Sequence, residues 1–345
     1  MTAPSSAVTS SSSSAPEIVT LQAHILQQQT GHPDATGQFS WILSALAISA
    51  KMISAHVRRA RLDDVLGAVG SQNVQGEQQQ KLDVIANDIL LRTLGGREGV
   101  AIVASEENEE PVILRADDSA ERKYCVLFDP LDGSSNLDVC GAVGTIFSIL
   151  LKDRRSTSAE GSLLQPGATQ VAAGYVLYGS STVFVLTIGL GVDMFVLDPA
   201  YGAFIRVARG MRLPQSNKCY SVNEGNRLTF PTGYQNYLAW AQQAGYSSRY
   251  AGAMVADVHR ILLQGGVFMY PATQKSPNGK LRLMYEANPM AMLVEQAGGK
   301  AFSAPKQRIL DVAPNNIHQR VPVVLGSADE VDHVMRHLQA DALTL

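Results

Sequence analysis

The sequence has few cysteines. Only three occur among its 345 residues, namely Cys125, Cys140 and Cys219. So small a number excludes the disulfide framework of a small secreted protein and is typical of a reducing compartment. No two of them have the Cys-x-x-Cys spacing of a zinc site. We therefore expect a cytoplasmic protein without structural zinc.

The chain also lacks a large excess of charge of either sign. Its 28 basic and 31 acidic residues give a net charge of −3. This balance favours neither nucleic acid nor an anionic membrane as a partner, although it is compatible with a local site for a phosphorylated small molecule. Hydrophobic residues make up 46% of the chain and charged residues 17%, which is typical of a globular protein with a sizeable core.

Basic residues are missing from the N-terminal region. The opening MTAPSSAVTSSSSSAPE is rich in Ser, Ala and Pro, and it predicts a disordered tail over residues 1–18. Its serines resemble those of an organelle transit peptide. Such peptides are rich in arginine, however, and the first basic residues here are Lys51 and Arg58. We favour a tail without a targeting role and keep organelle targeting as the alternative.

One uncharged segment has the length of a membrane span. Residues 171–192 carry no charged side chain until Asp193. The segment contains several glycines and alternates around GYVLYGSSTVFVLTIG. It therefore predicts two buried strands joined at residues 179–181, rather than a transmembrane helix.

Helices alternate with strands along the rest of the chain. Apolar spacing predicts helices over residues 39–60 (with Thr36 or Ser40 as the cap), 81–94, 236–245 and 254–266. Apolar runs predict strands over residues 100–105, 124–128, 144–151 and 267–272, and a strand end leading into a helix over 284–299. The glycine-containing stretch 61–80 is predicted to be a loop. This alternation is typical of a layered α/β fold, and the pattern loosens near residues 210–217, where we expect a domain boundary.

Carboxylates directly follow two of the predicted strands. Glu106 and Glu107 follow one strand, Asp129 follows the next, and Asp132 comes three residues later, beyond Pro130. Ligand sites in α/β proteins collect where strands end, so we expect these side chains to converge. Several carboxylates in one cleft repel each other unless cations bind between them. Oxygen ligands alone favour Mg²⁺ or Mn²⁺ over zinc.

A glycine turn follows the acidic residues. In Gly133-Ser134-Ser135-Asn136, free N–H groups at a turn or helix start can hold an anion. Carboxylates beside an anion site are the arrangement of metal-assisted phosphoryl transfer. The alternative interpretation is an exposed acidic loop with an Asx turn.

The run FDPLDGSSN resembles the signature of the metal-dependent, lithium-sensitive sugar and inositol phosphatase superfamily. Further stretches, among them VASEE, RYAGAMVADVHR and SPNGKLRLMYE, make the chain similar to the class I fructose-1,6-bisphosphatase family over residues 36–327. The resemblance implies an α-β-α-β-α sandwich of two packed subdomains. These would be an N-terminal regulatory and metal-site domain (19–210) and a C-terminal sugar-phosphate domain (211–345).

The resemblance implies hydrolysis of the 1-phosphate of fructose 1,6-bisphosphate, with two to three Mg²⁺ or Mn²⁺ ions per subunit. Asp83 and Glu107 would activate the attacking water, joined by Glu77 on a loop where the family often has aspartate. The implied metal ligands are Glu106, Glu107, Asp129, the Leu131 carbonyl, Asp132 and Glu286.

Substrate-binding residues are implied in the same way. The backbone of Asp132, Gly133, Ser134 and Ser135 would hold the 1-phosphate, while Gly252 and Met254 would line the sugar. The second phosphate would be bound by Asn223, Arg249, Tyr250, Tyr270 and Lys280. Arg249 would reach a neighbouring active site, which implies a homotetramer. Asn226 replaces a family tyrosine, so that pocket is expected to bind more weakly.

An AMP site is implied near the N-terminal helix. Its residues would be Thr36, Gly37, Gln38, Ser40, Lys123 and Tyr124. Leu151 stands where the family has an arginine, and Leu66 replaces a tyrosine. Losing an arginine removes a bidentate phosphate contact. We therefore expect AMP inhibition to be weakened or absent.

Alternatives stay open at this point. The same chemistry could serve sedoheptulose 1,7-bisphosphate, or the chain could be a sugar-phosphate-binding module without turnover. An inositol phosphatase is disfavoured by Lys280 and the tyrosines. Single residues also have simpler interpretations. Asp83 and Glu77 could cap or solvate a helix, Tyr270 could be a packed aromatic, one of Lys280 and Arg282 could be a surface charge, and His259 and Cys140 are expected to be structural and packed.

Overall fold

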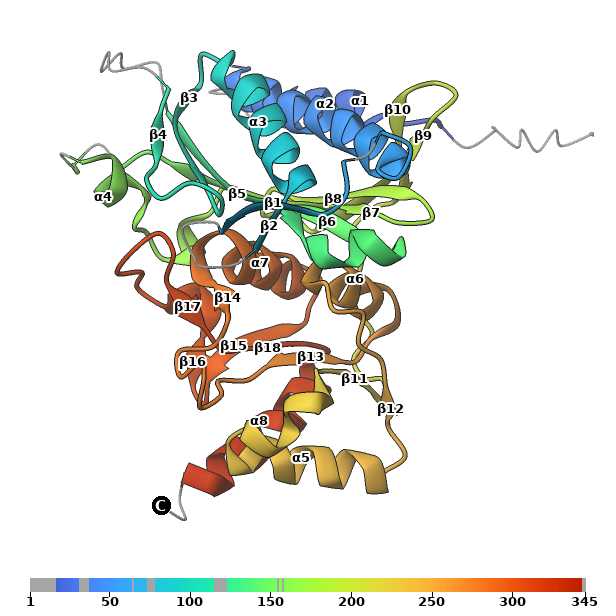
Figure 1. Ribbon diagram of the computed structural model, residues 1–345, viewed down its shortest axis with the longest axis vertical. Helices are drawn as coiled ribbons and strands as arrows, with labels where there is room; N and C mark the ends of the chain where they lie inside the picture. The colour runs from blue at the N-terminus through green and yellow to red at the C-terminus, as the bar shows by residue number, and fades with distance from the viewer. Residues whose placement is uncertain are drawn as a thin grey trace, which may run out of the picture.

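The computed structural model arranges the chain in five layers that alternate helices and sheets (Figure 1). It describes residues 17–30, 37–63, 65–72, 78–114, 123–153, 155–156 and 158–342. Thr36, Glu77 and nearly all of the expected tail lie outside these residues. The α-β-α-β-α sandwich predicted from the resemblance is confirmed.

Helices α1 (Leu21–Thr30), α2 (Gln38–Arg59) and α3 (Lys81–Gly95) form the first layer (Figure 1). Helix α2 begins after Gly37, whose φ of 77° is left-handed, and Ser40 lies inside its first turn. Ser40 as the cap was therefore wrong. Among the described residues, α2 is the one helix long and apolar enough to cross a membrane. Half of its most apolar window is buried inside the protein.

Part of the expected loop after α2 is a small hairpin. Strands β1 (Ala68–Gln72) and β2 (Gln78–Gln80) pair antiparallel, so a loop over all of 61–80 was wrong. The strand residues are mostly Gly, Ser and Gln, and they lack the apolar alternation by which strands are recognised in a sequence. Helix α3 begins directly after β2, as the helical spacing of residues 81–94 predicted.

The large sheet has eight strands in the order β10-β9-β8-β7-β6-β5-β3-β4. Strands β3 and β5 are parallel and the other neighbours are antiparallel. The uncharged segment 171–192 forms two of its strands, as predicted. The bounds are β3 (Val100–Ser105), β4 (Val112–Ile113), β5 (Tyr124–Asp132), β6 (Val143–Leu151), β7 (Ala172–Tyr178), β8 (Thr182–Thr187), β9 (Val192–Asp198) and β10 (Ala203–Ala208).

The second sheet has six strands in the order β12-β11-β13-β18-β15-β16. Helices α6 (Met254–Gln264) and α7 (Asn288–Gln296) lie between the two sheets. Helices α5 (Thr232–Gln243) and α8 (Ala328–Ala342) cover the outer face of the six-stranded sheet (Figure 1). Its strands are β11 (Cys219–Ser221), β12 (Ser247–Ser248), β13 (Val267–Tyr270), β15 (Lys300–Ala304), β16 (Gln307–Arg308) and β18 (Val323–Gly326).

Short elements complete the chain. The expected strand end at Met284–Glu286 was wrong, because these residues form a π-helical turn, Leu283–Ala287, that runs directly into α7. Strand β14 (Leu281–Arg282) pairs with β17 (Arg320–Val321), and α4 covers Ala159–Leu163. The 3₁₀ turns are Ser134–Val139, Gly167–Thr169, Glu224–Thr229 and Ile309–Asp311.

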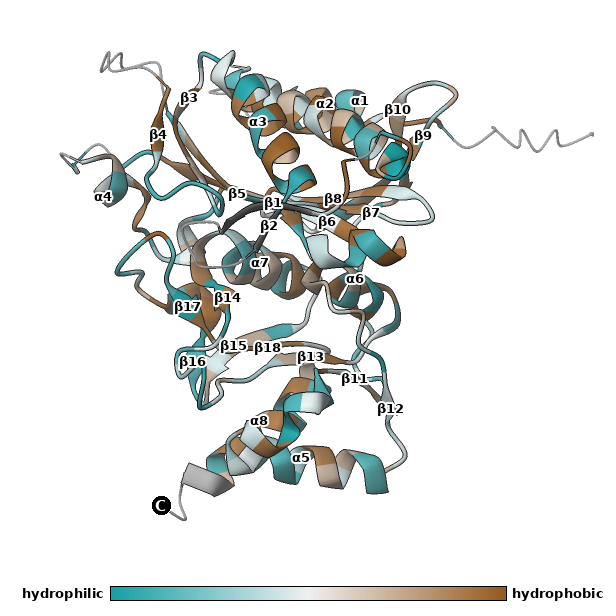
Figure 2. Ribbon diagram, in the orientation of Figure 1, coloured by the Kyte–Doolittle hydropathy of each residue, from teal (hydrophilic) through white to brown (hydrophobic). Residues whose placement is uncertain are grey.

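Alternation along the strands builds the core between the layers. In β5, Cys125 and Leu127 pack toward the middle helices, whereas Val126 and Phe128 pack toward α1–α3. Successive side chains of a strand point to opposite faces, so a strand buried on both faces is apolar throughout. The outer helix α8 shows alternating hydrophilic and hydrophobic segments, as expected for a helix with one buried face (Figure 2). The middle layer therefore joins both sheets into one body.

Candidate active site

The parallel strands β3 and β5 end side by side. Ser105 is paired with Phe128, and the Glu106 N–H donates to the Phe128 carbonyl at 3.1 Å. Glu106 and Glu107 therefore leave β3 at the same edge where Asp129 stands on β5. The two strands are neighbours, as the sequence argument required.

Strand β5 continues through the carboxylates, further than predicted. Its register against β6 shifts between Asp129 and Asp132, and such a bulge re-aims the side chains of a strand. The Leu131 N–H donates to Asp129 Oδ1 at 2.9 Å, and the Thr145 hydroxyl donates to the Pro130 carbonyl at 2.9 Å. These bonds hold the bulge in place, so both aspartates line one cavity.

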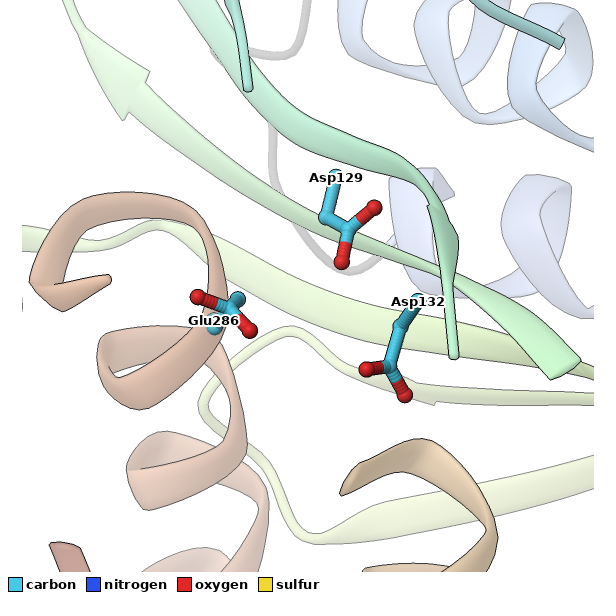
Figure 3. A group of neighbouring side chains, drawn as sticks. All are labelled: Asp129, Asp132 and Glu286. Carbon is cyan, nitrogen blue, oxygen red and sulfur yellow. The ribbon is translucent and has the colours of Figure 1, made fainter. Parts of the chain in front are cut away.

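Glu286 joins the two aspartates from the π-helical turn before α7. One carboxylate oxygen from each of Asp129, Asp132 and Glu286 lies within 4.8 Å of the others. Figure 3 shows the two aspartates on β5 and Glu286 facing them from the helix. All three side chains are buried. The sequence separation of Glu286 explains why spacing alone could not assign it to this cluster.

The electrostatics of the cluster favour a bound cation. Burial, followed by repulsion from Glu106, raises the pKa of Asp129 and of Glu286 well above the usual range for carboxyl groups. Burial likewise raises the pKa of Asp132 to about 6, although the Val255 N–H donates to its Oδ2 at 2.7 Å. Buried carboxylates this close are stable in the ionised form only with positive charge between them. An all-oxygen set fits a hard divalent cation.

The position of Arg282 beside the carboxylates was not predicted from the sequence. Its side chain is almost completely buried, and its Nη2 lies 3.6 Å from Glu106 Oε1. Its backbone N–H donates to Glu286 at 2.5 Å. The alternation of Lys280 and Arg282 left open that one of them is only a surface charge; Lys280 is exposed, and both residues line the cavity. No local signal reveals this, because the burial of Arg282 results from contacts between distant segments.

The glycine turn lies next to the carboxylates. Gly133 has a φ of 75°, which favours glycine, and the 3₁₀ turn Ser134–Val139 starts directly after it. A Cβ at position 133 would overlap the Cβ of Ala253. The turn is thus pressed against the start of α6, and it lines the cavity together with the acidic residues. Such a turn can present its N–H groups to an anion.

Asp83 connects this turn to the first layer of helices. It is buried at the third position of α3, where it forms a capping box with Gln80. Its Oδ2 accepts the Gln80 N–H at 2.8 Å and the Ser134 hydroxyl at 3.2 Å. Asp83 therefore caps helix α3 and also lines the cavity, where it accepts a hydrogen bond from the glycine turn.

The cavity has a volume of about 380 Å³. Besides the carboxylates and the turn, several residues from the second half of the chain line it, and these include every distal substrate contact implied by the resemblance except Arg249. They are Asn223, Tyr250, Gly252, Met254, Phe268, Tyr270, Lys280, Leu281 and Arg282. The exposed Arg249 donates to the Ser248 carbonyl at 3.0 Å.

The expected AMP residues gather where α2 and β5 begin. Phe39 contacts Tyr124 with ring centroids 5.8 Å apart, and the Lys123 and Tyr124 N–H groups both donate to the Gly99 carbonyl. Gly99 also lies against the Gln38 side chain. The structure thus brings this group together, although Thr36 lies outside its described part.

His259 was expected to be structural and Cys140 to be packed, and the structure confirms only the first. His259 is structural, as expected, because its ring contacts the buried Tyr175 with a hydrogen bond of 2.8 Å. Cys140 as a packed residue was wrong, since it is exposed at the end of the 3₁₀ turn with a φ of 57°. The other two cysteines are buried.

A layered α/β fold with buried carboxylates at strand ends, next to a turn suited to phosphate, defines the class of phosphate-ester hydrolases that require a cation. Comparison with known families narrows this class. The protein-family model of the fructose-1,6-bisphosphatase N-terminal domain matches residues 19–209. The family model of the C-terminal domain matches residues 213–339. The chain belongs to the fructose-1,6-bisphosphatase family, whose members are metal-dependent.

Individual relatives agree with this assignment. The chain is 48% identical over 324 residues to the class 1 fructose-1,6-bisphosphatase of Chloroherpeton thalassium, a match that covers 91% of this chain and 92% of the relative. Crystal structures of Leishmania major fructose-1,6-bisphosphatase are similar throughout. The holo form matches with a TM-score of 0.87 and 40% identity, covering 93% of this chain and 99% of that one. The T-state form gives 0.84 and 39%, covering 94% and 100%.

Proposed function

We propose that the protein hydrolyses the 1-phosphate of fructose 1,6-bisphosphate, giving fructose 6-phosphate and inorganic phosphate. One observation carries the proposal. A single cavity is lined by the carboxylate cluster, by the glycine turn that can present N–H groups to an anion, and by Lys280 with two tyrosines. This is the layout that a sugar carrying two phosphates requires. Membership of the fructose-1,6-bisphosphatase family supports it.

Mg²⁺ or Mn²⁺, two to three ions per subunit, is the cofactor we propose. Its ligands would be Glu106, Glu107, Asp129, Asp132 and Glu286, with the Leu131 carbonyl. When bound, the ions polarise the phosphate and make water more acidic. The buried, mutually repelling carboxylates support the proposal, because their pKa values are raised as long as no cation neutralises them.

The chain's own groups would orient the substrate and move the proton. N–H groups from Gly133 to Ser135 would hold the 1-phosphate. Asp83, paired with Glu107, would accept a proton from the attacking water. The Ser134 hydroxyl already donates to Asp83 Oδ2, which orients this carboxylate toward the phosphate-binding turn. Glu77 would add a second acceptor.

Neutral donors and one cation of the same subunit would bind the distal phosphate, together with Arg249 of a neighbouring subunit. Lys280 is exposed and lines the cavity, as do Tyr250, Tyr270 and Asn223. A phosphate bound there needs no metal, because an ammonium group and hydroxyl donors satisfy its oxygens. Gly252 and Met254 would contact the sugar between the two phosphates.

The direct test is phosphate release from fructose 1,6-bisphosphate in the presence of Mg²⁺. We expect turnover that chelation of the metal abolishes and that added Mg²⁺ or Mn²⁺ restores. Sedoheptulose 1,7-bisphosphate, the alternative substrate, would be measured in parallel. Faster turnover of that sugar would reassign the substrate, and absence of hydrolysis of either would refute the proposal.

Assembly and location complete the proposal. We propose a cytoplasmic homotetramer in which Arg249 reaches the active site of a neighbouring subunit. Its exposed position, outside the wall of its own cavity, supports this role. Mixing an Arg249→Ala chain with a separately inactivated Asp129→Asn chain tests it. Activity that appears only in the mixed oligomer would support a shared site, and mixed oligomers without activity would contradict it.

Weak AMP inhibition is the regulatory part of the proposal. The residue opposite Tyr124 across strands β5 and β6 is Leu151, which is half exposed. A leucine cannot provide the bidentate phosphate contact of an arginine. We expect inhibition only at millimolar AMP, and Leu151→Arg is expected to increase AMP sensitivity about tenfold. Inhibition of the wild-type protein at micromolar AMP would contradict this proposal.

A further inference from the structure

The backbone N–H and the backbone carbonyl of Ala251 are both held by side chains, although Ala251 does not line the cavity. Its neighbours in the chain, Tyr250 and Gly252, do line it. The Ala251 N–H points at both carboxylate oxygens of Asp257, at 3.1 and 3.0 Å. Its carbonyl accepts a hydrogen bond of 3.0 Å from the Asn136 side-chain amide. The backbone of this loop is therefore fixed by two side chains from different elements.

Asp257 is completely buried on α6. A buried carboxylate requires partners. One partner of Asp257 lies in the loop of residues 249–252, and the other partner binds that loop. Besides the Ala251 N–H, the Arg260 guanidinium lies 2.9 Å away, and its Nη2 also donates to the Arg249 carbonyl at 3.0 Å. The Asp257–Arg260 pair thus holds residues 249–251 against α6.

Asn136 belongs to the turn proposed to bind the first phosphate. It lies in the 3₁₀ turn that begins at Ser134, directly after Gly133. Its amide nitrogen donates to the Ala142 carbonyl at 3.2 Å as well as to Ala251, so both of its hydrogens are used. Asn136 therefore joins the turn for the first phosphate to the loop that carries Tyr250 for the second.

We propose that Asn136 and Asp257 are positioning residues that fix the distance between the two phosphate-binding subsites and so create a preference for sugar bisphosphates. The proposal rests on the proposed function. Neither side chain lines the cavity, so each acts through Ala251. Losing either contact allows the Arg249–Gly252 loop to move away from the turn, which weakens binding of the distal phosphate and leaves the first phosphate in place.

The test compares substrates with and without the distal phosphate. For Asn136→Ala we expect the KM for fructose 1,6-bisphosphate to rise about tenfold, with kcat within about threefold of the wild-type value. The KM for fructose 1-phosphate should change less than about twofold. Asp257→Asn should act in the same direction. Asp138→Asn, an exposed change in the same 3₁₀ turn, is the matched control and should leave both KM values unchanged.

Turnover of the wild-type protein tests the proposed function. Equilibrium binding to the variants tests the positioning role separately, because it does not depend on turnover. Asn136→Ala should weaken fructose 6-phosphate about tenfold and leave inorganic phosphate unchanged. Should Asp257→Asn fail to fold, Asn136→Ala carries the test. An equal rise of KM for both sugars, a fall of kcat alone, or unchanged fructose 6-phosphate binding would overturn the proposal.

Discussion

Asp129 is a carboxylate placed where its own charge is unfavourable. Burial is the main cause that raises its pKa, and repulsion from Glu106, Asp132 and Glu286 raises it further. The Leu131 N–H is the backbone donor that lowers it. Such an arrangement costs stability in the metal-free protein, because one negative charge must be protonated or neutralised. The proposed function gives the reason for this cost: the same repulsion that destabilises the free protein favours cation binding.

Asp129→Asn separates activity from stability. The amide has the same shape but no charge, so we expect turnover with Mg²⁺ to fall by about 1,000-fold or more. In the metal-free protein, thermal unfolding should occur at the same or a higher temperature, because one repulsive charge is gone. Enzyme assays and thermal scans check the two effects. Near-normal turnover, or a much lower unfolding temperature without metal, would contradict the assignment.

At this scale the sequence predicted the residues in one continuous run better than those that tertiary contacts bring in. Asp129, Asp132 and Gly133 lie in FDPLDGSSN, where a strand, a turn and an anion site follow each other directly. Glu286 entered only through the family resemblance. The burial of Arg282 beside Glu106 was missed, because helical or strand periodicity contains no information on which distant charge a side chain will meet.

The contact between the 3₁₀ turn and α6 is the element-scale feature on which the cavity depends. Gly133→Ala should disturb it in two ways, since alanine is strained at a φ of 75° and its Cβ would overlap Ala253. Gly202→Ala is the control, with a φ of 63° and open space around the added atom. We expect a loss of about 1 kcal/mol of unfolding free energy for Gly202→Ala.

For Gly133→Ala the expected loss of unfolding free energy is about 2–4 kcal/mol, because overpacking adds to backbone strain. Phosphate release should fall at the same time, whereas the control should keep it. Urea unfolding and enzyme assays measure both quantities. If the two variants were equally destabilised, the close approach of the turn to Ala253 would not matter for stability.

Helix α6 is also joined to the large sheet by the His259–Tyr175 hydrogen bond. Burial lowers the pKa of His259 to about 4, below its ordinary value of 6.5. The unfolded chain therefore binds more protons between these values. The contribution of neutral His259 is fully present above about pH 6.5 and is lost as the pH falls toward 4, by about 3 kcal/mol in total. The unfolding free energy of the His259→Gln variant should therefore fall less than that of the wild-type protein as the pH is lowered from about 6.5 to about 4. Parallel slopes in pH-dependent urea unfolding would contradict this.

Across the whole molecule, the cavity draws on both sheets. Strand β5 of the large sheet supplies Asp129 and Asp132, while residues after position 220 supply the distal lining and Glu286. Relative movement of the two halves would therefore change the carboxylate cluster. The middle helices α6 and α7 resist such movement because they pack against both sheets.

Metal binding and pH should act together on the stability of the whole molecule. Raised pKa values of Asp129 and Glu286, and a pKa of about 6 for Asp132, mean that the metal-free folded state binds more protons than the unfolded chain. Its stability from these groups is present at low pH and is lost as the pH rises. Mg²⁺ should thus raise the unfolding temperature more at about pH 8 than at about pH 5. Thermal scans with Mg²⁺ or a chelator check this, and an equal increase at both pH values would contradict it.

The layered fold could be predicted because its strands are buried on both faces and its helices are amphipathic. Residues 171–192 became β7 and β8 for this reason. The β1–β2 hairpin could not be predicted, since QQQ and AVGSQ lack apolar alternation. The π-helical turn at residues 283–287 was likewise hidden, because an apolar run of this length is compatible with a strand or a helix.

The exposure of Cys140 gives the protein a natural attachment point for a dye. The other two cysteines are buried, so a maleimide reagent should label the native fold at one position. That position ends the 3₁₀ turn that begins at Ser134. A fluorophore attached there would lie one short turn away from the proposed phosphate contacts, and its emission could follow sugar binding in real time without any engineered mutation.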